Sequence, residues 1–186
     1  MKDVSQVLDE QQQSVVLKLA RDAIRTVLQT EKEVEVPPDE FLFHPAGAFV
    51  TLKIHGELRG CIGFIEARYP LGETIVKCAI SAALHDPRFP PLRIQELPTT
   101  HIEVSVLSGL WQIQRPEEIE VGKHGIVISL GHSRGLLLPQ VAVEYGWDRL
   151  TFLKHTCHKA GLSPDAWQHP SARIELFSAQ VFGEPE

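Results

Sequence analysis

Two strand-like segments separated by a very short turn constrain the fold of this chain more than any other feature. From Ala48 to Ile54, apolar side chains alternate with Thr51 and Lys53, which is the period of a half-buried β-strand. A tight turn at His55-Gly56-Glu57 leads into a second strand, expected from Leu58 to Ile65. Strands joined by so short a connection pair antiparallel. The sequence therefore predicts an antiparallel sheet near its middle.

Segments of helical period flank this hairpin. From about Gln12 to Gln29, apolar residues recur at helical spacing and predict an amphipathic helix. A charged loop over residues 31–39 separates that helix from the hairpin, and a second helix is expected over residues 73–85. Asp86-Pro87 ends the second helix, because the residue before a proline disfavours the helical region.

The rest of the chain continues the mixture of strands and helices. We expect strands over residues 101–107, 126–130 and 173–181, and helices over residues 140–145 and 149–160. Because there is no strict strand–helix–strand repetition, the α+β class fits best, with a mixed, mainly antiparallel sheet and packed helices.

Helix ends in the C-terminal half carry clear signals. Pro139 suits a first helical turn, where its missing N–H is no loss. Asp148 is placed to cap the next helix, and Gly161 is a natural left-handed stop. The turn expected over residues 131–135 offers backbone amides and Arg134 to an anion, but it lacks the phosphate-loop pattern.

Length, charge and cysteine usage exclude several classes of protein. The 186 residues suit one compact domain, which we place over residues 7–183. A net charge of −6 argues against nucleic-acid binding, which needs a basic surface. No apolar run approaches the roughly 20 residues that span a bilayer, and the polar N-terminus does not resemble a signal peptide. Three widely spaced cysteines indicate free thiols, so we expect a cytoplasmic protein without a membrane segment.

The segment Leu58-Arg59-Gly60-Cys61-Ile62-Gly63 is the main candidate site. In an extended strand, Arg59 and Cys61 project to the same face with backbones roughly 6.5–7 Å apart. A guanidinium there would favour the thiolate and make Cys61 a nucleophile or a thiolate binding site. The alternative is a small buried cysteine packed between two glycines, with Arg59 in a structural salt bridge.

Other polar residues supply further candidates. His85 is a candidate general base oriented by Asp86, and Arg88 is a candidate ligand for a carboxylate or phosphate. In the alternative, His85 satisfies the end of its helix and Asp86 forms a local turn. Gln140 and Glu144 lie four residues apart on one short helix, facing either a pocket or water.

No metal site or cofactor is expected. His155, Cys157 and His158 are close in sequence, but on a helix residues 155 and 157 diverge by roughly 200°. Paired CxxC and HExxH spacings do not occur.

Long segments of the sequence resemble the AMMECR-one domain family. The resemblance extends from the first helix to about Phe182, and its segments occur in the family's order. They are Phe49-Val50-Thr51-Leu52, Leu58-Arg59-Gly60-Cys61-Ile62-Gly63, Asp86-Pro87-Arg88-Phe89-Pro90-Pro91, residues 122–125, Leu137-Leu138-Pro139-Gln140-Val141-Ala142, Glu144-Tyr145-Gly146-Trp147 and Cys157-His158-Lys159-Ala160-Gly161-Leu162.

The resemblance implies an α+β fold with two subdomains and says little about activity, since the family's biochemical role is poorly defined. Prokaryotic members are grouped as protein A of the AmmeMemoRadiSam system, with a Memo-like protein and a radical SAM protein as the implied partners. This chain has no CxxxCxxC motif, so it is not the radical enzyme.

Two hypotheses follow for function. In the first, the chain is a non-catalytic partner that binds a small-molecule ligand, a protein or a reactive intermediate for another enzyme. In the second, it is an enzyme in which Cys61 is the nucleophile, with Arg59 and His85, for a small polar or anionic substrate. The sequence contains no complete set of nucleophile, base and orienting residue, which favours the first hypothesis.

Overall fold

The computed structural model describes residues 7–185. It contains α-helices and antiparallel strands, which confirms the predicted α+β class. The chain divides into two compact units. The first unit runs to Leu107 and takes up the chain again from Gln180, and the second unit covers residues 108–179.

The first unit is built on an antiparallel sheet in which β1 (Ala48–Ile54) lies between β2 (Glu57–Phe64) and β3 (Thr100–Leu107). All three strands lie within about two residues of their predicted positions. The end of β7 (Arg173–Gly183) follows β3 in the strand order. β2 is therefore the edge strand of this sheet.

A β-bulge interrupts the pairing of β1 with β2. Leu52 is opposite Gly60, but Lys53 is opposite Leu58, so that Arg59 is the extra residue. A bulge leaves one residue unpaired and locally bends the strand. The regular alternation of side chains along β2 is therefore broken at Arg59.

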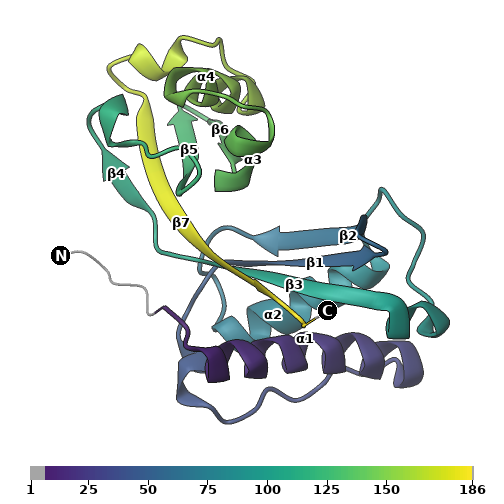
Figure 1. The fold of residues 1–186 in the computed structure, drawn as a ribbon. Helices are drawn as coiled ribbons and strands as arrows, with labels where there is room; N and C mark the ends of the chain where they lie inside the picture. Colours follow the sequence, from purple (N-terminus) through teal and green to yellow (C-terminus); the bar gives the residue numbers. More distant parts are fainter. Residues whose placement is uncertain (1–6, 186) are drawn as a thin grey trace. The chain divides into compact units, whose positions relative to one another are not determined.

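Two long helices pack on this sheet: α1 (Glu10–Thr30) and α2 (Leu71–Leu84) (Figure 1). α1 begins with a capping box, because Asp9 accepts the Gln12 N–H and the Gln12 side chain accepts the Asp9 N–H. α2 ends at Leu84 with His85 as its C-cap, immediately before Asp86-Pro87 as predicted. The short 3-10 helices η1 (Glu40–Phe43) and η2 (Ile94–Thr99) complete the unit.

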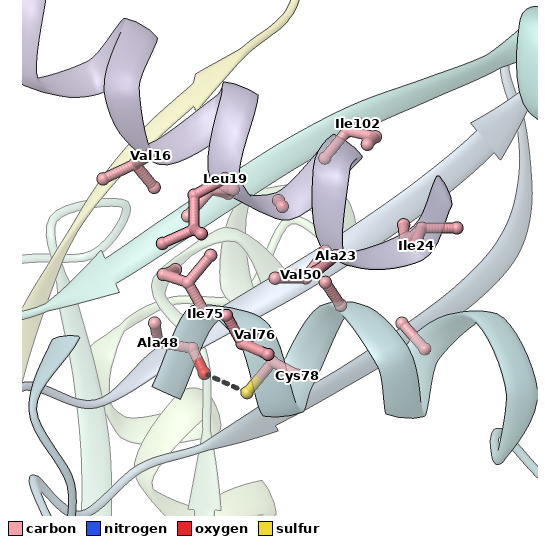
Figure 2. Packing of buried hydrophobic residues seen from close by; sticks show 14 of the residues in the cluster. Val16, Leu19, Ala23, Ile24, Ala48, Val50, Ile75, Val76, Cys78 and Ile102 are labelled. Carbon is pink, nitrogen blue, oxygen red and sulfur yellow. Dashed lines mark hydrogen bonds between the residues drawn. The ribbon is translucent and has the colours of Figure 1, made fainter. Parts of the chain in front are cut away.

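The core of the first unit lies between the two helices and the sheet (Figure 2). It contains apolar residues of α1, α2, β1 and β3, among them Val16, Leu19, Ala23, Ile24, Ala48, Val50, Ile75, Val76, Cys78 and Ile102. Cys78 is fully buried there, and its thiol lies 3.6 Å from the Ala48 carbonyl oxygen. Burial raises the pKa of the Cys78 thiol to about 12.

The second unit has its own antiparallel sheet. It consists of β4 (Trp111–Ile113), β5 (His124–Leu130), β6 (Ser133–Leu137) and the first part of β7, in the order β4-β7-β5-β6. β4 and β6 were not expected from the sequence. In particular, the turn predicted over residues 131–135 is shorter, since residues 133–135 already belong to β6. The predicted anion-binding turn is thus mostly strand.

Helices α3 (Pro139–Glu144) and α4 (Arg149–Lys159) cover this second sheet, with η3 (Pro116–Glu118) and η4 (Ala166–Gln168) in the connections. Their predicted end signals are confirmed: proline stands at the first turn of α3, the Asp148 carboxylate accepts the Thr151 N–H at 2.7 Å, and Gly161 has φ +74°. The core here is separate from that of the first unit and contains Ile126, Ile128, Phe152, Leu153, Cys157 and Leu176. None of the helices within residues 7–185 is both long enough and apolar enough to cross a bilayer.

Candidate functional site

Gly60 brings edge strand β2 into direct contact with helix α2. A Cβ atom at this position would lie 2.2 Å from the carbonyl oxygen of Ala82, so that only glycine fits. Because neighbouring residues of a strand point to opposite faces, Cys61 points away from α2. Its register partner on β1 is Thr51. Glycine at position 60 thus permits the close approach of α2, and the alternation along β2 places the thiol on the other face of the sheet.

A buried carboxylate holds the backbone of Cys61 from outside the sheet. The Asp86 side chain is only 2 % exposed, and one of its oxygens accepts the Cys61 N–H at 2.9 Å. The other oxygen accepts the backbone N–H of Arg88 at 3.1 Å. The residues immediately after α2 therefore cover the outer edge of β2, which pairs with no other strand within residues 7–185.

The Arg88 guanidinium completes this contact. It donates to both oxygens of Asp86, at 3.0 and 2.7 Å, and to the Cys61 carbonyl oxygen at 3.3 Å. Both backbone groups of Cys61 are thereby hydrogen-bonded to side chains, as they would be to a neighbouring strand. The bonds from the Arg88 guanidinium, with those from the backbone N–H groups of Cys61 and Arg88, hold the pKa of the Asp86 carboxyl well below its usual range. We refer to Cys61, Asp86 and Arg88 as the edge clasp.

Arg59 has partners in the same connecting segment. Its guanidinium forms a bidentate pair with the Glu96 carboxylate, at 2.9 and 3.2 Å, and donates to the Pro90 carbonyl oxygen at 2.9 Å. This pairing lowers the pKa of the Glu96 carboxyl. Arg59 and Cys61 would project to the same face only in an uninterrupted strand. The bulge at Arg59 interrupts the strand, so that expectation does not apply. The guanidinium instead holds residues 90–96 against β2.

The Cys61 thiol is half-buried, and its hydrogen-bond partner is the Thr51 hydroxyl, with 3.2 Å between Oγ1 and Sγ. Among residues 7–185 the His85 ring makes no hydrogen bond to this thiol, and His85 is exposed. The Asp86 carboxylate is occupied by Arg88 and Cys61, so it does not orient His85. The structure therefore does not assemble a hydrogen-bonded pair of Cys61 and His85.

The remaining residues of the predicted motif differ in their surroundings. Leu58 is 41 % exposed, whereas Ile62 packs against the core. Gly63 lies against the ring of Phe49, because a Cβ atom there would be 2.3 Å from the ring carbons. Among the six motif residues, Leu58 is thus the one with a large, exposed apolar side chain.

The structure does not gather all predicted site residues in one unit. Residues 58–63, Asp86 and Arg88 belong to the first unit, whereas Gln140 and Glu144 are exposed on α3 of the second unit. In the same second unit Cys157 is buried in the core, while the exposed His155 ring stacks on Trp147 with 3.9 Å between centroids. No cluster of three or more His, Cys, Asp or Glu side chains within the described range is placed to hold a metal ion.

Sequence reasoning missed two residues of the site, Thr51 and Glu96. Thr51 was assigned to the polar face of β1, but its partner depends on the register of the hairpin. Glu96 lies 37 positions from Arg59 in the chain, and no local pattern links the two. The opposite charges of the two side chains are the signal that connects these positions in the sequence, and many other pairs of residues share it.

The exposure of Cys61 makes its reactivity testable. Cys78, whose pKa is raised to about 12, is almost entirely protonated near pH 8, and its burial also keeps the reagent away from it. Burial also raises the pKa of Cys157. We expect Cys61 to react with iodoacetamide at least about 100-fold faster than either buried thiol, as measured by peptide mass spectrometry of the native protein. A Cys61→Ser variant should lose the fast phase; equal, slow labelling of all three thiols would contradict the expectation.

These features define the class of the chain: an α+β protein of two compact units, with the segment Leu58–Gly63 on a clasped edge strand. The chain belongs to the AMMECR1 family, whose family model matches residues 17–182. The expectation drawn from its sequence segments is thereby confirmed.

Relatives agree with this assignment over nearly the whole length. A protein of Methanopyrus kandleri is 50 % identical over 181 residues, covering 92 % of this chain and 87 % of its own. A protein of Pyrococcus furiosus is 45 % identical, covering 91 % and 86 %. The crystal structure of an uncharacterized protein from Pyrococcus horikoshii matches with a TM-score of 0.83 at 44 % identity, covering 91 % of this chain and 89 % of that one.

Proposed function

We propose that this protein is a non-catalytic binding component of the cytoplasm, which acts with a Memo-like protein and a radical SAM protein. The observation that carries the proposal is that the polar side chains around the motif are hydrogen-bonded to the protein itself. Asp86 and Arg88 hold the backbone of Cys61, and Arg59 holds Glu96. These groups are committed to keeping one edge of the sheet in place, which suits a surface for recognition.

A catalytic role would need more than this arrangement offers. Nucleophilic catalysis by a thiol requires a base within hydrogen-bond reach and a third group that orients the base. In the described part of the chain, the hydrogen-bond partner of the Cys61 thiol is the Thr51 hydroxyl, which donates to the sulfur and is too weak a base to take up its proton. Binding is the function that this geometry supports best.

The partners are proposed from the family resemblance, and Leu58 supplies a contact point for them. Leu58 is exposed and lies three positions before Cys61 on the same strand, so it offers an apolar side chain near polar groups, the combination from which protein interfaces are built. Full burial of a leucine side chain contributes roughly 1.5–3 kcal/mol, of which Leu58, 41 % exposed, would gain a part; an amide in its place would add the cost of its own desolvation. The unpaired thiols Cys61, Cys78 and Cys157 support a reducing compartment.

A substitution at Leu58 tests this proposal. We expect Leu58→Asn to weaken the complex with the purified Memo-like or radical SAM protein of the same organism at least about tenfold, measured by calorimetry. Leu150→Asn is the matched control, because Leu150 is 47 % exposed in the second unit and away from the motif in sequence. Equal affinities for both variants would count against Leu58 as a contact. Failure of the unmodified protein to bind either partner would reject the partner assignment.

A second candidate function is nucleophilic catalysis by Cys61 on a small polar or anionic substrate. The observation in its favour is that Cys61 is the half-buried thiol, while Cys78 and Cys157 are buried. In this case Cys61→Ala would abolish turnover in a reconstituted system while leaving the affinity for the partner proteins unchanged. If Cys61→Ala retains full turnover in that system, the thiol is not a nucleophile.

A further inference from the structure

The second unit contains a pocket that no part of the proposed function uses. It has a volume of about 620 Å³ and lies where β4, the start of β7 and the segment around η4 meet. The side chains that matter for its chemistry are Gln112, Gln114, Trp167, Gln168 and His169. Volumes of this size are typical of small-molecule sites, which range from roughly 300 to 1,000 Å³.

The lining has unused hydrogen-bonding capacity. Gln112, Gln114 and Gln168 are exposed, and within residues 7–185 their side-chain amides form no hydrogen bond to another protein group, so a ligand would only have to replace water on them. Trp167 lines the same pocket, and its indole Nε1 is buried without a hydrogen-bond partner in the described part of the chain. An unpaired buried donor is costly, so native proteins rarely keep one without a reason. Because the side chain of Trp167 lines the pocket, a ligand bound there would change the surroundings of this N–H.

The type of ligand follows from the lining groups. The side chains found to line the pocket include no Asp, Glu, Lys or Arg, so an ionic ligand has no carboxylate, ammonium or guanidinium partner there. The His169 Nδ1 accepts the backbone N–H of Ser171 at 3.1 Å, which leaves Nε2 as the protonated nitrogen of a neutral ring and as a donor. Each glutamine offers a donor and an acceptor side by side.

We infer that this pocket binds an uncharged small molecule with adjacent hydrogen-bond donors and acceptors, as in a lactam or imide ring. A side-chain amide pairs with such a group through two parallel hydrogen bonds, which is how glutamine recognises a base edge. The buried Ile113 and Ile174 supply apolar surface for the ring. The pocket shares no residue with Leu58–Gly63 or the edge clasp, so a test of ligand binding here is independent of the test of the proposed function.

Uracil is a suitable probe, and the indole N–H resonance of Trp167 can be used to detect its binding. The protein has three tryptophans, so a ¹⁵N-labelled sample shows three indole N–H resonances. The Trp167 resonance is assigned by its loss in Trp167→Phe. We expect uracil to shift it saturably, while the Trp147 resonance stays in place. 1,3-Dimethyluracil, which lacks both N–H donors, should bind at least about tenfold more weakly.

Two variants separate recognition from folding. Gln112→Leu combined with Gln168→Leu should weaken uracil binding at least about tenfold, whereas Gln95→Leu, at an exposed position of the first unit, should leave it unchanged. The dispersion of the amide spectrum shows whether each variant is folded. Absence of a Trp167 shift up to the solubility limit of uracil would overturn the inference. So would equal binding of dimethyluracil, of acetate, or of uracil by the folded double variant.

Discussion

Asp86→Ala is expected to lower the free energy of unfolding by on the order of 3 kcal/mol. The substitution removes a nearly fully buried carboxylate and leaves the Cys61 N–H without its partner. It also takes away the counter-charge of Arg88. Urea unfolding of both proteins at neutral pH measures the difference.

Asp22→Ala is the matched control for that measurement. Asp22 also pairs with two cations, Lys18 and Arg25, but on the solvent side of α1. Exposed ion pairs of this kind contribute about 0–1 kcal/mol. If Asp86→Ala were no more destabilising than Asp22→Ala, the edge clasp would contribute nothing beyond a surface pair.

The same carboxylate predicts a pH dependence. Because the pKa of Asp86 is lower in the folded protein than in the unfolded chain, where it is about 3.9, its stabilising contribution is fully present above that value. The contribution is lost as the pH falls from there through the folded pKa. Asp86→Asn should therefore show a smaller loss of stability than the unmodified protein when the pH is lowered from about 5 to about 2.

Gly60→Ala is the second substitution for which we expect a large effect. The added Cβ would lie 2.2 Å from the Ala82 carbonyl oxygen, a backbone atom that cannot move without shifting α2. Overpacking of this kind typically costs about 1–3 kcal/mol, and here a rigid helix backbone is the obstacle, so we expect the upper end of the range. Thermal unfolding monitored by circular dichroism gives the measurement.

Cys61→Ala, one position further along β2, controls for the site. It removes the thiol and its bond from Thr51 but adds no atom, so its expected cost is about 1 kcal/mol or less. A Gly60→Ala protein as stable as Cys61→Ala would mean that β2 and α2 separate easily. The packing described here would then be incorrect at its closest contact.

Local patterns were sufficient to predict most elements and their ends. The alternation over β1 and the helical periodicity of α1 indicate which side chains face a core. Both patterns can be recognised from residues close together in the sequence. Signals at helix ends act on the backbone within a few residues, so the roles of Pro139, Asp148 and Gly161 could be predicted from the sequence. The motif segment and the family were recognisable for the same reason, as uninterrupted runs of residues.

Short strands were not predictable in this way. β4 has three residues and β6 has five, too few for a period to stand out, and each is held by its pairing with a strand elsewhere in the chain. The bulge at Arg59 was hidden as well, because it arises from the register between β1 and β2. At the bulge Arg59 pairs with Glu96, which is the structural salt bridge considered as the alternative to a place beside the thiol.

The sequence by itself determined the α+β class and the antiparallel hairpin, since these depend on local periodicity and on a short connection. Only the tertiary structure decided what surrounds Cys61. Its partners Thr51, Asp86 and Arg88 lie 10, 25 and 27 positions away. Contacts across such separations follow from how α2 and the strands pack, and a carboxylate becomes a buried clasp only when that packing excludes water from it.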